Sequence, residues 1–180
     1  MSVQLLKNLA DHLARIDMPY MIIGGQAVLL YGEPRLTRDV DITLGTTPQR
    51  LGEVLGMVEA MELRLLVDDP ADFVRQTWVL PALDEESGLR VDFIFSWTAY
   101  EQQAIHRAHT VDVAGSPVQF AAPEDVIIHK ALAGRPRDWE DVRSILRKQD
   151  MDRSYIHRWL QEFSTTVAKD LVTPFEELYK

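Results

Sequence analysis

Residues 39–44 (Asp-Val-Asp-Ile-Thr-Leu) begin with acidic and aliphatic side chains in strict alternation. Successive side chains of a β-strand point to opposite faces, so this segment predicts a strand with one polar and one apolar face. Asp39 and Asp41 share the polar face, and Val40 and Ile42 point into a core. Two adjacent carboxylates repel each other, and one is pushed toward protonation unless a cation neutralises them. Two solvated acids at a strand edge would show the same pattern, so the pair alone does not establish a metal site.

A strand-to-helix junction precedes this acidic strand. The apolar run Met21–Ile23 predicts a strand that ends at Gly24-Gly25, and residues 26–31 are typical of a short helix. Glycines at such a junction let the backbone approach a phosphate closely, and the first N–H groups of the helix can bind the anion. A tight turn alone would also use two glycines.

The order of these two features is more specific than either feature alone. An aliphatic run, Gly24-Gly25, a spacer of residues 26–38 and then Asp39-Val40-Asp41 resemble the signature of the nucleotidyltransferase superfamily. Its members share the palm fold of DNA polymerase beta. Within it, residues 32–41 resemble the Gly-x-x-Arg-x-Thr-x-Asp-x-Asp form of the AbiEii and MenA-like toxin branch. The resemblance covers residues 21–42 and implies an α/β (α+β) fold, with a mixed-sheet palm core and a C-terminal helical region.

The resemblance also implies a third carboxylate on a neighbouring strand. Asp92 fits this role, because it is an acid within the otherwise apolar strand predicted at residues 89–95. Burying an unpaired acid there would be costly, so a cation or a partner is expected. The partner could equally be Arg90 or Arg64 at the surface of the sheet.

The toxin branch further implies a lysine on a later helix that holds the triphosphate, with an acid some residues on. Lys130 and Asp138 match these positions. A lysine beside apolar helix residues can reach a triphosphate as a point charge. Two structural roles remain open: Lys130 extending to solvent, and Asp138 capping the next helix or pairing with Arg135.

The activity implied is transfer of a nucleoside monophosphate from a nucleoside triphosphate to an acceptor hydroxyl. Asp39 and Asp41 would hold two Mg²⁺ ions and Asp92 would complete the first site, since Mg²⁺ prefers oxygen ligands. The remaining nucleotide contacts expected are the backbone N–H groups of Gly24, Gly25 and Gln26, the side chains of Thr37 and Lys130 with Asp138 nearby, and the charge of Arg35 or Arg38.

The acceptor is less constrained. The resemblance suggests tRNA or another RNA end, with a toxin or antitoxin partner protein, and residues 128–158 carry eight Lys and Arg against five Asp and Glu as a dock for RNA. A solvated helix face of mixed charge explains that segment equally well. The net charge of −9 disfavours broad nonspecific binding of nucleic acids. The alternatives are an antibiotic nucleotidyltransferase acting on aminoglycosides or lincosamides, a protein AMPylating enzyme, and a non-catalytic nucleotide-binding antitoxin or partner module. The intact set of three acids argues against the last.

Length and composition set the remaining bounds. With 180 residues, 46% of them hydrophobic, the chain can bury a core, and the lack of cysteine excludes disulfides and thiolate metal sites. Residues 1–16 predict an amphipathic helix and no signal peptide, and the apolar run 18–23 is too short to span a bilayer. We therefore expect a cytoplasmic protein with a core at residues 1–121 and a helical region at 122–180 packed on it.

Periodicity and turn residues predict the other elements. We expect strands at 63–67, 73–80 and 89–95, a hairpin at 110–120, and helices at 3–17, 46–61, 98–108, 123–133, 138–149, 152–163 and 170–179.

Overall fold

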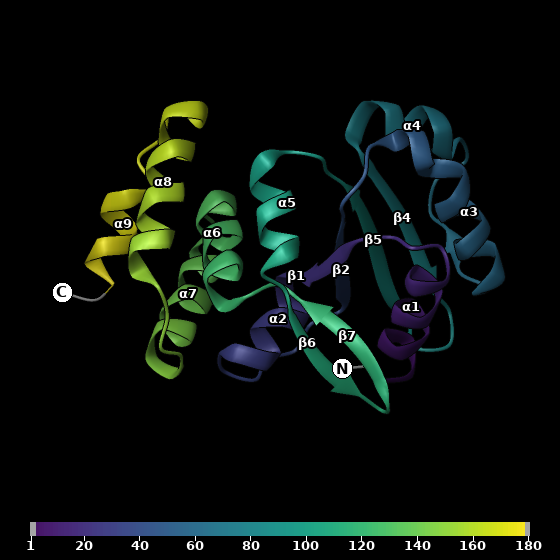
Figure 1. Cartoon of the computed structure of the whole chain (residues 1–180), viewed down its shortest axis with the longest axis horizontal. Helices are drawn as coiled ribbons and strands as arrows, with labels where there is room; N and C mark the ends of the chain where they lie inside the picture. The colour runs from purple at the N-terminus through teal and green to yellow at the C-terminus, as the bar shows by residue number, and fades with distance from the viewer. Residues whose placement is uncertain (1–2, 179–180) are drawn as a thin grey trace. The chain divides into compact units, whose positions relative to one another are not determined.

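One mixed sheet organises the first part of the chain (Figure 1). In the computed structural model, which describes residues 3–178, seven strands lie in the order β3-β4-β5-β2-β1-β7-β6. The central strand β2 runs parallel to β5 and antiparallel to β1, and β1 runs parallel to β7. The strands are β1 (Tyr20–Ile23), β2 (Asp39–Leu44), β3 (Arg64–Leu65), β4 (Val79–Asp84), β5 (Leu89–Phe95), β6 (His109–Val113) and β7 (Ser116–Phe120).

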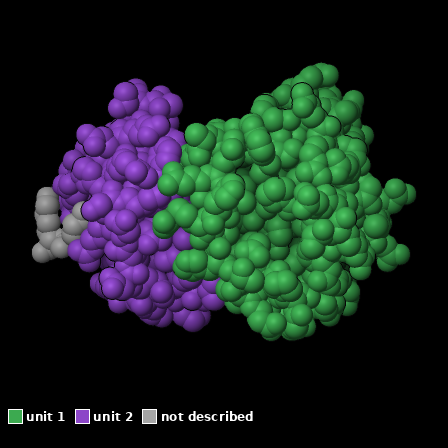
Figure 2. Space-filling view, viewed as in Figure 1, with its two compact units in different colours: residues 1–26, 37–121 green, residues 27–36, 122–180 purple. Residues whose placement is uncertain are grey.

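Two compact units divide the chain (Figure 2). Unit 1 consists of residues 1–26 and 37–121, and unit 2 consists of residues 27–36 and 122–180. The boundary within the first segment falls inside α2 (Gly24–Tyr31). Unit 1 contains the sheet with α1 (Val3–Arg15), the short 3-10 helix η1 (Pro48–Arg50), α3 (Leu51–Ala60), α4 (Pro70–Thr77) and α5 (Ala99–His106). Unit 2 contains α6 (Pro123–Ala133), α7 (Pro136–Lys148), α8 (Arg153–Val167) and α9 (Val172–Glu177). The predicted domain boundary at residue 121 stays a prediction.

The core of unit 1 follows from alternation along the strands. Val91, Phe93 and Phe95 point to the buried face of β5, whereas Arg90 and Asp92 point to the other face. Burial of each large apolar side chain contributes about 1.5–3 kcal/mol to folding. The apolar face thus fixes the register of the sheet, because a slip by one residue would bury the acids.

Helix α6 forms the centre of unit 2, where it packs against α7 and α8. It is buried around most of its circumference, including the carboxylates of Glu124 and Asp125 at its first turn. Each of these acids accepts a hydrogen bond: Glu124 from the backbone N–H of Asp152 at 3.0 Å, and Asp125 from the hydroxyl of Tyr155 at 2.8 Å. Both of these buried acids are therefore hydrogen-bonded.

The mixed sheet followed by helices confirms the predicted fold class, but one predicted strand is wrong. Residues 73–80 form the end of α4 and the start of β4. Asp69 caps α4 by accepting the N–H of Asp72 at 2.9 Å, and Pro70 occupies the first turn, so local capping starts a helix one turn before the apolar residues. The helix ends at Trp78, which has a left-handed backbone (φ 60°).

Two other predicted elements differ in length. The strand expected at 63–67 is reduced to β3, and the helix predicted at 170–179 corresponds to α9, although residue 179 lies outside the described residues. Among residues 3–178, none of the helices combines the length and apolarity that crossing a membrane requires.

Candidate active site

Three carboxylates meet on one face of the sheet in unit 1. Strands β2 and β5 are parallel neighbours, with Asp41 opposite Asp92 and Asp39 opposite Arg90. Residues opposite each other in paired strands share a face, and neighbouring strands lie about 4.8 Å apart. Asp39 is exposed, whereas Asp41 and Asp92 are half-buried. The alternation that predicted each strand separately thus places all three acids on one face of the sheet, with Asp41 opposite Asp92.

Asp92 has a protein partner. Nε of Arg90 lies 2.8 Å from Oδ1 of Asp92, which is one of the pairings that the sequence left open. The arginine side chain is about half exposed, and ion pairs of this kind contribute little to stability. A bound cation could therefore displace Arg90 at small cost.

Gly24 forms the floor beside the acids. It has a left-handed backbone (φ 63°) at the junction of β1 and α2, and a Cβ atom there would lie 1.9 Å from Oδ2 of Asp41. Two constraints therefore require glycine: the backbone conformation and the close approach of the carboxylate. The first turn of α2 consequently begins directly against Asp41.

The carboxylate oxygens of these acids could supply part of the coordination of a Mg²⁺ ion, with a bound ligand supplying the rest. Among residues 3–178, no group of three or more His, Asp or Glu side chains is arranged to hold a metal ion by itself. Mg²⁺ usually takes one or two carboxylates together with phosphate oxygens and water. Two or three acids on an open sheet face next to a glycine turn match that requirement.

Side chains on either side of the acidic strand hold its first residue. Nε2 of Gln26 and Oγ1 of Thr37 both donate to the carbonyl oxygen of Asp39, at 3.2 and 3.3 Å. Gln26 is only 1% exposed, and its Oε1 has no hydrogen-bond partner within residues 3–178. The predicted triphosphate contacts of Gln26 and Thr37 stay predictions, but their side chains already have a structural role. The exposed Arg38 donates to no protein acceptor among those same residues, so its charge is available to a ligand.

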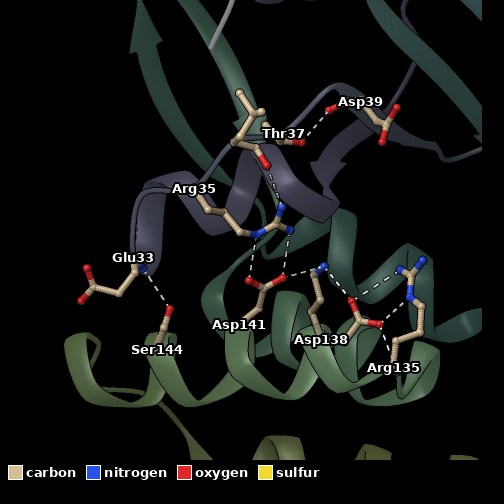
Figure 3. A network of polar contacts seen from close by, with 10 residues as sticks. Glu33, Arg35, Thr37, Asp39, Arg135, Asp138, Asp141 and Ser144 are labelled. Carbon is tan, nitrogen blue, oxygen red and sulfur yellow. Dashed lines mark hydrogen bonds and ion pairs between the residues drawn. The ribbon is translucent and has the colours of Figure 1, made fainter.

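A network of ion pairs in unit 2 connects basic and acidic side chains in alternation (Figure 3). Nζ of Lys130 lies 2.9 Å from both Oδ1 of Asp138 and Oδ2 of Asp141. Asp141 also accepts two hydrogen bonds from Arg35, and Asp138 accepts one from the Nε of Arg135 at 2.7 Å. The Lys130 side chain is 9% exposed, so it does not extend to solvent.

The environment of Asp138 keeps it ionised. Burial raises the pKa of this carboxyl, but hydrogen bonds from Arg135 and Lys130 outweigh burial and leave the pKa below its ordinary value. Asp138 also accepts the backbone N–H of Arg135 at 3.1 Å, so it caps α7 as well as pairing with Arg135.

The predicted site residues therefore fall into two groups. Unit 1 contains Gly24, Gly25, Gln26, Thr37, Arg38, Asp39, Asp41 and Asp92, and unit 2 contains Arg35, Lys130 and Asp138. Sequence reasoning missed Asp141. It lies one helical turn after Asp138 on the face of α7 that also carries the buried Val142 and Ile145. An acid at such a position signals a buried partner.

Comparison with solved structures places this fold among known enzymes. The solution structure of the antibiotic-resistance factor ANT(2'')-Ia is similar, with a TM-score of 0.65 and 20% identity over 92% of each chain. The lincosamide antibiotic adenylyltransferase LnuA, solved with lincomycin bound, has a TM-score of 0.57 and 16% identity over 81% of this chain and 96% of its own. An antigenic nucleotidyltransferase-like protein from Paracoccidioides brasiliensis has a TM-score of 0.57 and 16% identity over 97% and 91%. At these identities the similarity shows the fold.

Sequence comparison gives the family. A search of curated proteins found no match. The profile of a family described as nucleotidyltransferases of unknown function (DUF6036) matches residues 2–176, which is nearly the whole chain. The predicted superfamily is thereby confirmed, whereas the toxin branch stays a prediction. The chain belongs to this nucleotidyltransferase family, and it is an enzyme that transfers nucleotidyl groups.

Proposed function

We propose that this chain transfers a nucleoside monophosphate from a nucleoside triphosphate to an acceptor hydroxyl, with two Mg²⁺ ions held by Asp39, Asp41 and Asp92. One observation carries the proposal. The three carboxylates share a sheet face directly beside Gly24, whose missing side chain brings the start of α2 against Asp41. The start of a helix can bind phosphate, and neighbouring carboxylates can hold Mg²⁺, so the two features together suit a nucleotide with its metal ion.

Several residues would have separate roles in the transfer reaction. When bound, Mg²⁺ would activate the acceptor oxygen and neutralise charge on the phosphates. Asp92 would take the proton of the acceptor hydroxyl, since a carboxylate can act as a general base. The acceptor oxygen would bond to the α phosphorus, and the β and γ phosphates, held by the backbone N–H groups of Gly24, Gly25 and Gln26, would leave as pyrophosphate. Arg38, and not Arg35, would balance developing charge, because Arg35 is already bound to Asp141.

Lys130 would supply a further phosphate contact. Its ammonium group has three N–H donors, and two are directed to Asp138 and Asp141. The third would bind a phosphate oxygen, as resemblance to the toxin branch implies. Asp138 would then act through Lys130 by fixing the position of its ammonium group.

Removing the metal-binding carboxylates tests the core of this proposal. Asp39→Asn/Asp41→Asn keeps the shape of both side chains, so the fold should remain while transfer falls by at least about a hundredfold. Label from each α-labelled nucleoside triphosphate would be followed into total RNA, cell protein, and a panel of aminoglycosides and lincosamides. Full transfer by a folded double variant would contradict the proposal.

A methyl group at Gly24 tests the glycine turn. Gly24→Ala should abolish most transfer, because its Cβ would overlap the Asp41 carboxylate, and the left-handed backbone should cost about 1–2 kcal/mol of stability. Gly52→Ala is the matched control, since a Cβ at this position in α3 meets open space. Equal transfer by the two variants, measured beside their urea unfolding, would show that the close approach is not needed.

An RNA end is the acceptor that we propose. A cavity of about 390 Å³ on α7 is lined by three arginines, Arg137, Arg143 and Arg147, together with Arg35, Ser144, Glu33, Glu140 and Asp141. The guanidinium groups of these three α7 arginines have no ion-pair or hydrogen-bond partner in the part of the chain that the structure describes. These arginines extend over about 15 Å along the helix, so they could bind successive phosphates of an RNA strand. A toxin role would follow from an RNA acceptor, as the resemblance implies.

A small polycationic hydroxyl compound is the second candidate. Unit 1 contains sixteen Asp and Glu residues against eight Lys and Arg, so its field favours cations. ANT(2'')-Ia and LnuA, whose names link them to antibiotics, share the fold. Both candidates use the same carboxylates, and they differ in the surface that binds the acceptor.

Neutralising the α7 arginines separates the two acceptors. Changing all three to Gln should lower RNA labelling by about tenfold or more and reduce the salt dependence of RNA binding by about two units of slope. Labelling of a small compound should not change. The matched control removes three arginines from unit 1, as Arg15→Gln/Arg64→Gln/Arg75→Gln. RNA labelling that survives the α7 change would reject this surface as the dock.

A further inference from the structure

The two halves of the signature are joined through the other unit. Gly24 to Gln26 and Thr37 to Asp41 belong to unit 1, but residues 27–36 between them belong to unit 2 (Figure 2). The chain therefore leaves unit 1 after the glycine turn and re-enters it just before the acidic strand. We refer to residues 31–36, which begin at the last residue of α2, as the connecting segment.

Helix α7 and the residue after it hold the connecting segment by its backbone. Oγ of Ser144 accepts the N–H of Glu33 at 2.9 Å, and Nζ of Lys148 donates to the carbonyl oxygen of Gly32 at 3.1 Å. Gln149 donates to the carbonyl oxygen of Tyr31 at 3.1 Å. The approach at Gly32 is close, because a Cβ atom there would lie 2.3 Å from Oγ of Ser144. A side chain at this position would therefore displace the Ser144 hydroxyl.

A two-point ion pair fixes the far end of the connecting segment (Figure 3). Nε and Nη2 of Arg35 donate to the two carboxylate oxygens of Asp141, each at 2.9 Å, and Nη1 donates to the carbonyl oxygen of Leu36 at 3.3 Å. Every nitrogen of the guanidinium group therefore has a protein acceptor. The pair is largely buried, with exposed fractions of 21% and 6% for the two side chains. Pairing of this kind fixes orientation as well as distance.

Asp141 is itself held in place. Its Oδ2 lies 2.9 Å from Nζ of Lys130, which Asp138 holds from the other side. The anchor for Arg35 is thus a buried carboxylate whose charge is balanced by two cations. Arg35 precedes Asp39 by four residues, and only Leu36, Thr37 and Arg38 separate the anchored position from the first acid.

We propose that Asp141 and Arg35 are positioning residues that set the place of Asp39 by fixing the connecting segment, and that Arg35 does not touch the nucleotide. The proposal rests on the assignment of Asp39 to the metal site. It replaces the expectation that Arg35 neutralises charge on the phosphates, because each nitrogen of its guanidinium group already donates a hydrogen bond within unit 2. Displacement of a metal-binding residue by about 1 Å can cost about a hundredfold in rate.

Two variants test this without removing a proposed ligand of the nucleotide. Arg35→Lys keeps the charge and loses the two-point pairing, and Ser144→Ala removes the acceptor of the Glu33 N–H. Both should lower kcat by about tenfold to a hundredfold, while KM and the calorimetric Kd for the nucleotide stay within about twofold. A rise in Kd for Arg35→Lys alone, with kcat kept in Ser144→Ala, would overturn the proposal and assign Arg35 to the nucleotide.

Hydrogen exchange gives a readout that does not depend on activity. Backbone amides at residues 36–41 should exchange faster in both variants than in the unchanged protein, because the connecting segment is released. Arg50→Lys is the matched control, since Arg50 makes a two-point pair with Glu53, at 2.7 Å for each contact, outside the connecting segment. It should change neither kcat nor exchange at residues 36–41.

The outcomes separate the two proposals. If the unchanged protein labels no acceptor but both variants accelerate exchange at residues 36–41, the proposed function fails and the positioning role stands. If exchange and kcat are unaltered in both variants, the positioning role is wrong. Where Arg35→Lys does not fold, Ser144→Ala decides the question by itself, because it deletes one hydroxyl and leaves every buried charge paired.

Discussion

The close approach of Gly24 to the Asp41 carboxylate is the constraint on which the site depends. It requires β1 to lie beside β2 and the chain to turn through a residue with a left-handed backbone. Helix α2 must then begin next to the Asp41 carboxylate. Pairing of β2 with β5 then adds Asp92 from a segment far along the chain. The apolar side chains on the opposite face of these strands keep the register, so the same packing that stabilises the sheet also places Asp41 beside Asp92.

Charge is handled differently in the two units. In unit 2 the carboxylates of Asp138 and Asp141 are buried and balanced by Lys130, Arg35 and Arg135, which suits a fixed framework. In unit 1 the acids lie on a more open face, with Arg90 as the one partner found for Asp92 within residues 3–178. A site that must take up cations and release product needs acids that a cation can reach, whereas an anchor needs buried acids with lasting partners. Along the sequence, the connecting segment leads from the buried ion pairs of unit 2 to the acidic strand of unit 1.

Local patterns predicted most of the strands and helices, together with the glycine turn that lies beside Asp41. Alternation revealed β2 and β5, and the two glycines revealed the turn, because each signal is contained within a few residues. The strand predicted at residues 73–80 was wrong, because the apolar residues suggested a strand whereas the N-terminal cap at Asp69 starts helix α4. The role of Asp141 could not be predicted in the same way. Its partner Arg35 is 106 residues distant, and only the folded chain brings them together.

We propose above all that the acids and the glycine turn form one metal-dependent nucleotide site. Calorimetric titration of the protein with a non-hydrolysable nucleoside triphosphate analogue, with and without Mg²⁺, tests it most directly. We expect the affinity for the analogue to be at least about tenfold higher when Mg²⁺ is present, because phosphate oxygens complete the coordination that the carboxylates begin. Equal affinity in the two titrations would contradict it, since the three acids would then have no part in binding the nucleotide.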